Sequence, residues 1–299
     1  MSSSKGIDAF VKFGEKAGDY SQQYADAELA EFYPEHRFRL KIFMDLLAKI
    51  QPRKVLDIGC GSGDPLSAIL GQGHDAYGFD FSPEMVAQAQ RTLTDRGLDA
   101  TRVSRNNMED IREIRPGEFD CMVGLGSLYY SRNFPRTMQS IAGLLPEGGN
   151  IVFSLRNELF SLFSLNKYSA EFLMDRLMPL EGLSESLRNR VSTLLETRFA
   201  ELPQPKKFKT IDEIGIYSEY HNPLTVQDEV LTPCGLKLEG VYYYHFHALP
   251  PVFEHSDTVE FRRLSAQMES NPRDWRGAFM SSAFIVHASK PRSPTGTAP

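Results

Sequence analysis

The spacing of apolar residues divides the chain into helical and extended segments. Between residues 8 and 50, apolar positions such as Phe32, Leu40, Phe43 and Leu47 recur at helical spacing, which predicts helices that end before Pro52. Beyond that point, short apolar runs alternate with helical patterns. The predicted strands are 54–58, 74–79, 100–104, 119–125, 150–155, 238–247 and 278–288, and the predicted helices are 65–70, 82–96, 135–145 and 225–232. This alternation predicts right-handed crossovers and a mostly parallel sheet.

Two stretches interrupt the alternation. Residues 156–222 contain no strand pattern, and their leucines and valines at helical spacing predict an inserted helical cap. A second insertion occupies about 250–276, between the last two predicted strands. The C-terminal residues 291–299, rich in Pro, Ser and Thr, are expected to be disordered.

The composition limits the classes of protein to which the chain can belong. The chain has 299 residues, 41% hydrophobic content and a formal charge of −6, which is ordinary for a globular protein and disfavours non-specific nucleic-acid binding. Cys60, Cys121 and Cys234 lie far apart, so neither a disulfide framework nor a zinc motif is expected. No run of about 18 apolar residues occurs, and no signal core opens the chain, so we expect a cytoplasmic protein without a membrane span.

A glycine-rich loop follows the first predicted strand. Asp57 is followed by a Gly-x-Gly-x-Gly pattern over residues 59–63, in a position where doubly wound sheets bind their ligands. A dinucleotide site requires Gly-x-Gly-x-x-Gly, but Asp64 occupies the place of the third glycine. A carboxylate at Asp57 would repel a pyrophosphate and suits a cationic ligand.

This loop resembles the signature of class I S-adenosylmethionine-dependent methyltransferases, and the order of elements from about residue 52 to 290 resembles that family's fold. The resemblance implies an α/β, Rossmann-like sheet of seven strands, five parallel and two in a C-terminal antiparallel hairpin, with an inserted helical cap. It also implies a division of the chain. Residues 1–51 would cover the cofactor site, 52–155 and 223–290 would form the core, and 156–222 would form the cap.

The same resemblance implies the contacts of the cofactor. Asp80 would accept the ribose hydroxyls, and Met108 would pack on the adenine. Asn107 departs from the aspartate usual in the family, but its amide oxygen can still accept from the adenine amine. Gly124 would line the methionine moiety, and Tyr20 would close over its carboxylate or be a core aromatic. The residues expected to contact S-adenosylmethionine, which leaves as S-adenosylhomocysteine, are Asp57, Gly59, Cys60, Gly61, Gly63, Asp80, Phe81, Asn107, Met108, Gly124 and Tyr20.

Candidate catalytic and substrate-binding residues follow the later strands. An activated methyl donor leaves at most a general base to be supplied by the protein. His245 and His247 are expected on one face near the end of a strand, and His221 lies where the chain re-enters the sheet, although each could be a packed polar residue. Arg156 could clamp an anionic group or pair with Glu158. The candidate substrate-binding residues are Tyr129, Tyr130, Arg156, Asn157, Tyr168 and Tyr244.

These features predict methyl transfer to a small molecule, first to a hydroxyl or carboxyl oxygen of natural-product or saccharide type. Methylation of a small amine is the alternative, and a catalytically silent cofactor-binding partner subunit is an alternative of another class. A nicotinamide dehydrogenase is disfavoured by Asp64. We expect no metal, no nucleic acid and no membrane as partners, and a monomer or homodimer. The acceptor itself is not specified by the sequence.

Overall fold

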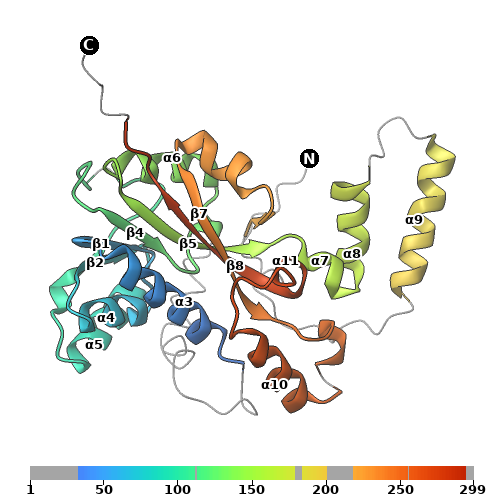
Figure 1. The fold of residues 1–299 in the computed structure, drawn as a ribbon, viewed down its shortest axis with the longest axis horizontal. Helices are drawn as coiled ribbons and strands as arrows, with labels where there is room; N and C mark the ends of the chain where they lie inside the picture. Colours follow the sequence, from blue (N-terminus) through green and yellow to red (C-terminus); the bar gives the residue numbers. More distant parts are fainter. Residues whose placement is uncertain (1–32, 112, 179–183, 201–217, 255, 294–299) are drawn as a thin grey trace.

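The computed structural model describes residues 33–111, 113–178, 184–200, 218–254 and 256–293. Within these residues an eight-stranded sheet has the order β3-β2-β1-β4-β5-β8-β7, with β6 beside the end of β5 (Figure 1). The strands are β1 (Lys54–Ile58), β2 (Asp75–Asp80), β3 (Val103–Arg105), β4 (Cys121–Gly124), β5 (Asn150–Asn157), β6 (Tyr220–His221), β7 (Lys237–Phe246) and β8 (Ser281–Ser289). Strands β1 to β5 pair in parallel, whereas β8 runs antiparallel to β5 and β7. The predicted methyltransferase-like sheet with a C-terminal antiparallel hairpin is confirmed.

Helices cover both faces of the sheet. The helices of the described residues are α3 (Glu35–Ile50), α4 (Asp64–Gly71), α5 (Pro83–Asp95), α6 (Phe134–Leu144), α7 (Phe160–Ser164), α8 (Lys167–Phe172), α9 (Glu185–Ala200), α10 (Thr258–Met268) and α11 (Gly277–Met280). Shorter helical turns are η1 (Ala100–Arg102), η2 (Leu128–Tyr130), η3 (Leu173–Leu177), η5 (Gln227–Leu231), η6 (Thr232–Cys234) and η7 (Pro251–Phe253).

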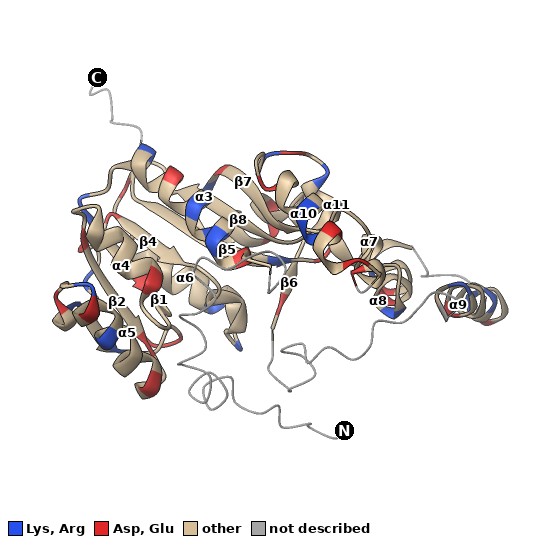
Figure 2. Cartoon of the chain, turned by 90° about the horizontal axis from the view of Figure 1, so that it is seen from below, with Lys and Arg blue, Asp and Glu red and all other residues tan. Residues whose placement is uncertain are grey.

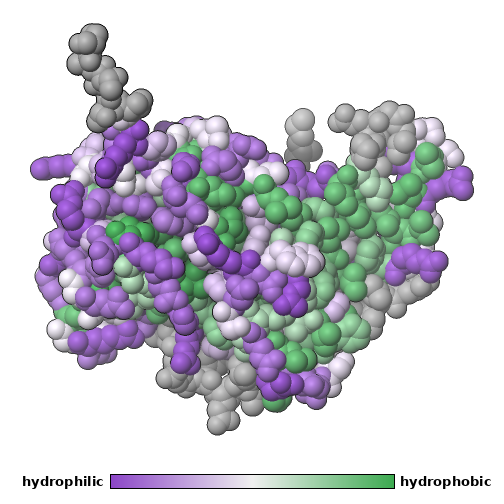
Figure 3. Space-filling model, viewed as in Figure 1, coloured by the Kyte–Doolittle hydropathy of each residue, from purple (hydrophilic) through white to green (hydrophobic). Residues whose placement is uncertain are grey.

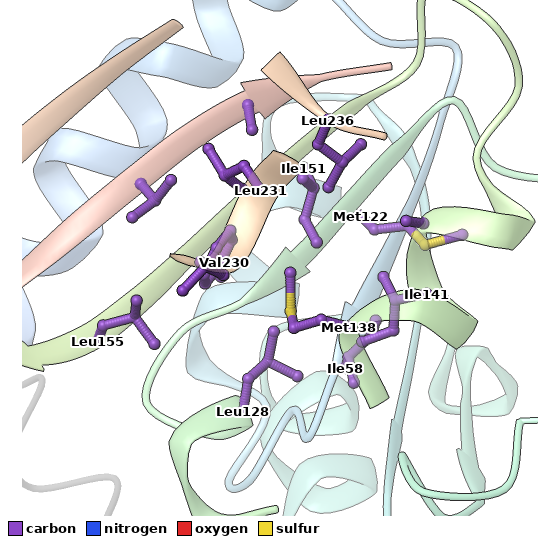
Figure 4. Packing of buried hydrophobic residues seen from close by; sticks show 14 of the residues in the cluster. Ile58, Met122, Leu128, Met138, Ile141, Ile151, Leu155, Val230, Leu231 and Leu236 are labelled. Atoms are coloured by element: carbon purple, nitrogen blue, oxygen red, sulfur yellow. The ribbon is translucent and has the colours of Figure 1, made fainter. Parts of the chain in front are cut away.

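Two hydrophobic cores sandwich the sheet because successive strand residues point to opposite faces. On one face, α3, α4 and α5 pack around strand residues that include Val55 and Val123. On the other face, α6 and the η5 turn pack on residues that include Leu56 and Met122. Figure 4 shows this second core from close by, with Met138 of α6 among the labelled residues. Each fully buried aliphatic side chain of this kind stabilises the fold by roughly 1.5–3 kcal/mol.

The strand directions bring the predicted site residues to one edge. Strand β7 runs parallel to β5, because both are antiparallel to β8. The carboxyl ends of β1, β2, β4, β5 and β7 therefore meet at one edge, where doubly wound sheets bind ligands. The glycine loop, Gly124, Arg156 and His245 lie at or next to these ends.

Local signals predicted most of the elements around the glycine loop. Strand β1 has the predicted bounds, and Ser82 caps α5 by accepting a hydrogen bond from the amide of Met85. Three expectations were wrong in detail. The two-residue strand β6 lies inside the segment expected to be free of strands, residues 227–234 form π-helical and 3-10 turns, and α11 replaces the start of the last strand. The carbonyls of Gly277 and Ala278 are bound by the Asn157 side chain, a partner 120 and 121 residues away.

The region between β5 and β6 is helical where it is described, with α7, α8, η3 and α9. Figure 3 shows hydrophobic residues gathered on this side of the molecule. The exposed large apolar side chains of this region include Tyr168, Leu177, Leu187 and Leu194. The predicted cap boundaries stay a prediction, as does the covering role of residues 1–51, most of which lie outside the described residues.

Charged residues of both signs are interspersed along the helices in Figure 2. No helix of the described ranges is long and apolar enough to cross a membrane. In the same part of the chain, no three His, Cys, Asp or Glu side chains are grouped so that they could hold a metal ion.

Candidate active site

The glycine loop after β1 has a backbone that excludes larger residues at two positions. Gly59 has a φ of 70°, and a Cβ atom there would lie 2.5 Å from the Cβ atom of Ser127. Gly63 has a φ of 82°, and its added Cβ would lie 2.9 Å from the Cα atom of Ala89. The Gly59 amide donates to the Phe79 carbonyl at 2.9 Å, which ties the loop to the end of β2. The loop can therefore bring its backbone very close to a ligand.

Asp80 lies at the end of β2 beside this loop. Its Oδ2 accepts the Gly61 amide at 3.0 Å and its Oδ1 accepts the Ser82 amide at 2.9 Å. Burial raises the pKa of Asp80, and the two hydrogen bonds partly oppose this shift. A carboxylate offers about four lone-pair sites, so Asp80 can still accept hydrogen bonds from two ligand hydroxyls.

Asp57 is a buried carboxylate whose Oδ2 has no hydrogen-bond partner among the described residues. Burial and the charge of Asp80 raise the pKa of Asp57 to about 7, and the charge of Arg39 opposes them. Two neighbouring carboxylates, one with an unpartnered oxygen, form a site that suits hydroxyls and a positive charge. S-adenosylmethionine carries ribose hydroxyls, an ammonium and a sulfonium, so the donor and acceptor set fits that cofactor.

Arg39 is a site residue that sequence reasoning missed. It is 5% exposed, and its guanidinium lies so close to Gly126 that a Cβ atom there would overlap it. Burial raises the pKa of Tyr244, and interactions of its hydroxyl with Arg39 and Ser154 oppose that shift. The Ser154 Oγ accepts the Gly126 amide at 2.7 Å. The sequence did contain a signal for Arg39. It is a charged residue four positions before Phe43, so it lies on the apolar face of α3.

The remaining predicted cofactor residues occupy different surroundings. Met108 reaches toward the loop, with its Cε atom 3.8 Å from the position of a Cβ on Gly59. The Asn107 Oδ1 accepts the Glu109 amide at 2.9 Å, which occupies one of its two acceptor positions. The Phe81 ring faces the Arg105 guanidinium at 5.4 Å. Cys60 is buried in the loop, and Tyr20 lies outside the described residues.

The structure brings Tyr129, Tyr130 and Arg156 together at the end of β5. The guanidinium carbon of Arg156 lies 5.3 Å from the Tyr129 ring and 6.0 Å from the Tyr130 ring. Tyr220 of β6 completes this aromatic group and accepts a hydrogen bond from Arg156 at 3.1 Å. Glu158, considered from the sequence as a partner of Arg156, instead forms hydrogen bonds with Arg176 at 2.7 and 3.3 Å.

The other predicted substrate-binding residues have different surroundings. Asn157 is 1% exposed, and its amide nitrogen donates to the carbonyls of Ala278 and Ser281 at 2.9 and 2.8 Å. The Asn157 side chain therefore stabilises the junction between α11 and β8. Tyr168 is 45% exposed on α8. Tyr244 is 4% exposed, and both Arg39 and Tyr129 act electrostatically on its hydroxyl, so it lies between Arg39 and the aromatic group around Arg156.

The three predicted histidines are in unlike environments. The rings of His245 and His247 are 4.9 Å apart, and both have lowered pKa values because of burial, His247 to about 3. The His247 Nδ1 lies 3.2 Å from the carbonyl oxygen of His245, whereas the His245 ring forms no hydrogen bond in the described part of the chain. His221 packs on Phe134 and lies 3.7 Å from Glu219, and burial lowers its pKa to about 4.

Comparison with known proteins places this arrangement in a family. Residues 29–198, more than half of the 299-residue chain, match a family model described as a methyltransferase domain. The ubiquinone biosynthesis O-methyltransferase of Methylococcus capsulatus is 25% identical over 224 residues, which cover 74% of this chain and 90% of that protein. The protein of the same name from Vibrio atlanticus is 26% identical over 229 residues, with 75% and 91% covered.

Solved structures share the fold at low sequence identity. A putative methyltransferase of Haloferax volcanii, solved with the Trm112 methyltransferase activator, has a TM-score of 0.54 and 13% identity, with 96% of this chain and 98% of that chain covered. The magnesium protoporphyrin IX methyltransferase of Synechocystis, solved with bound SAH, has a TM-score of 0.52 and 14% identity, with 94% and 97% covered. Together with the glycine loop and its two carboxylates, these matches show that the chain belongs to the class I S-adenosylmethionine-dependent methyltransferases.

Proposed function

We propose that this enzyme methylates an oxygen of a small molecule, at a hydroxyl or carboxyl group of natural-product or saccharide type. The observation that carries the proposal is the uncharged, half-buried His245 ring, which forms no hydrogen bond in the described part of the chain and lies at the carboxyl edge of the sheet. The names of the O-methyltransferase relatives agree with it. An unprotonated amine would need only positioning, so a poised base favours oxygen over the alternative, a small amine.

The cofactor residues have distinct roles in this proposal. Asp80 accepts the two ribose hydroxyls, the glycine loop allows close backbone approach, and Asp57 faces the positive charge of the ligand. Arg39 binds the carboxylate of the methionine moiety beside Gly126. S-adenosylmethionine, when bound, supplies a methyl group activated by the positive charge on sulfur.

The acceptor side uses different elements. A ring nitrogen of His245 accepts the proton of the acceptor hydroxyl as the new bond forms. Burial would raise the pKa of Glu35, but its ion-pair contact with His36 Nδ1 at 3.4 Å and the charge of His245 lower that pKa to about 2. The ionised Glu35 then stabilises the protonated His245 ring. The rings around Arg156 orient the acceptor by stacking and cation–π contacts.

Calorimetric titration with S-adenosylmethionine and S-adenosylhomocysteine tests the cofactor site. We expect micromolar binding by the native protein and about tenfold or weaker binding by Asp80→Ala, because a charge-assisted hydrogen-bond acceptor is lost. Asp95→Ala, an exposed aspartate on the following helix, is the matched control and should bind normally. Equal affinity of Asp80→Ala and the native protein would remove Asp80 from the site. Intact binding without turnover of any hydroxyl, carboxyl or amine acceptor would favour the silent partner subunit.

A second titration tests the role of Arg39. We expect Arg39→Met to bind S-adenosylmethionine about 30-fold more weakly, because a charge-assisted pair with the carboxylate is lost. Its affinity for 5′-methylthioadenosine, which lacks the amino-acid moiety, should stay the same. Arg37→Met, on the exposed side of the same helix, is the control. Equal weakening for both ligands would mean that Arg39 supports the site as a whole.

A further inference from the structure

His245 has an unusual backbone for its place in the fold. Three non-glycine residues of the described ranges have positive φ, namely Gln51, Leu165 and His245. Gln51 and Leu165 end helices, where a left-handed residue is common. His245, with a φ of 57°, instead lies within strand β7, between Tyr244 and Phe246, which both pair with β8. Such a conformation costs free energy and persists only where its surroundings hold it.

The surroundings that hold His245 centre on Glu269. Its Oε1 accepts the amide of Phe246, the next residue, at 2.9 Å and the Tyr33 hydroxyl at 2.6 Å. The backbone amide of His245 also interacts favourably with the Glu269 carboxylate, as a hydrogen-bond donor. Glu269 is 7% exposed at the end of α10, and its Oε2 has no hydrogen-bond partner among the described residues. A buried acidic side chain thus binds the backbone at the strained residue.

Tyr33 connects this backbone contact to the imidazole ring. Its own ring stacks on the His245 ring, with centroids 5.4 Å apart and planes inclined by 20°. His247 lies on the imidazole at 4.9 Å. The ring is therefore held by stacking, and no residue of the described ranges forms a hydrogen bond with its nitrogen atoms. Glu269 fixes the backbone of residues 245–246, and the tyrosine that it binds fixes the ring.

We propose that Glu269 and Tyr33 are positioning residues that hold His245 in its left-handed conformation and direct its ring to the methyl acceptor. The inference rests on the proposed function of His245 as the base. Both partners come from outside the sheet, Tyr33 from just before α3 and Glu269 from the end of α10. The packing of these two segments on β7 therefore builds the proposed acceptor side of the site.

The test is a carbon-13 NMR titration of the histidine rings in the full chain between pH 4 and 9. His245→Gly identifies the His245 signal by its loss, because glycine accepts a φ of 57° without strain. The titratable and charged groups around His245 are Glu35, Glu254 and Arg156, the histidines His36 and His247, and the Glu269 carboxylate at its backbone. The variants are Glu269→Gln and Tyr33→Phe, which removes the hydroxyl and keeps the ring. Glu260→Gln, at an exposed glutamate of α10, is the matched control.

We expect the His245 midpoint to rise by about half a pH unit or more in both variants, toward the ordinary histidine value, because the ring becomes more hydrated. Burial raises the pKa of Glu269 to about 7, so the native carboxylate is charged mainly in the upper part of this pH range. Loss of that negative charge alone would lower the His245 midpoint, so an upward shift reports movement of the ring. Glu260→Gln should titrate like the native protein. An unchanged His245 signal in both variants would overturn the inference.

Kinetics separate this inference from the function on which it rests. With catechol and 3,4-dihydroxybenzoate as probe acceptors, we expect both variants to lower kcat about tenfold with little change in KM, because a misplaced base affects the reaction more than binding. If His245→Gly keeps the native kcat, the proposed base is wrong. If His245→Gly loses activity while Glu269→Gln and Tyr33→Phe keep it, only the positioning role is wrong.

Discussion

Replacement of His245 by asparagine is expected to lower kcat by roughly 10²- to 10⁴-fold, the usual contribution of a general base. Burial lowers the pKa of His245, so the ring is uncharged and able to accept a proton at neutral pH. Asparagine tolerates the left-handed region better than most residues, so the backbone at φ 57° should survive the substitution. The measurement is release of S-adenosylhomocysteine at saturating S-adenosylmethionine, with an acceptor that the native enzyme turns over.

The control is His74→Asn, at the turn that precedes β2 and therefore at the opposite edge of the sheet. We expect His74→Asn to keep the native kcat, and both variants to bind S-adenosylmethionine with native affinity. A rate loss that adding imidazole to His245→Gly partly restores would assign the effect to the missing base. A native rate in His245→Asn would leave His247 and His221 as the predicted candidates, or show that the acceptor needs no base.

Replacement of Asp57 by asparagine is expected to stabilise the ligand-free protein above pH 7 by up to about 4 kcal/mol. The folded-state pKa of Asp57 is raised from 3.8 to about 7, chiefly by burial, and each unit corresponds to about 1.4 kcal/mol. Between these two values the folded chain binds the proton more tightly than the unfolded chain. Ionisation of Asp57 therefore destabilises the native state increasingly as pH rises from about 4 to 7.

Urea unfolding of both proteins at pH 5 and pH 8 measures this effect. The variant should be more stable at pH 8, and the difference should shrink at pH 5. Burial lowers the pKa values of His221 to about 4 and His247 to about 3, which acts in the opposite direction, because their contribution is lost as pH falls. Both proteins contain these histidines, so the difference between them isolates Asp57.

Asp95→Asn, at an exposed aspartate, should show no such difference. A variant less stable than the native protein at pH 8 would mean that Asp57 accepts a stabilising hydrogen bond. The expected pattern, combined with weaker cofactor binding by Asp57→Asn, would show that the fold tolerates a buried charge here for the sake of its ligand.

Helix α3 connects the two halves of the candidate site. Its N-terminal turn carries Glu35, which acts on His245, and the next turn carries Arg39, which lies over Gly126. Residues three or four positions apart share a helix face, so one helix can serve both the cofactor side and the acceptor side. A change in the packing of α3 on the sheet would therefore affect both ligands together.

Local patterns in the sequence predicted the elements that hold the cofactor. The apolar run of β1, the glycine loop and the Ser82 cap are specified by residues close together in the chain. Asp57 and Asp80 could be singled out because each lies at or next to the carboxyl end of an apolar strand. The parallel order of the sheet also followed from the alternation of strands and helices, since crossover connections leave few topologies.

Only the tertiary structure decided how the acceptor side is built, because its contacts join residues far apart in sequence. The hydrogen bond between Tyr33 and Glu269 spans 236 positions, and no local pattern indicates it. Arg39 belongs to the candidate site because α3 packs beside the end of β4 and brings the guanidinium to Gly126. Asn157, expected to bind substrate, proved to hold the backbone at the start of β8. Sequence alone determined the sheet and the glycine loop, whereas packing of distant segments determined which side chains line the proposed acceptor side.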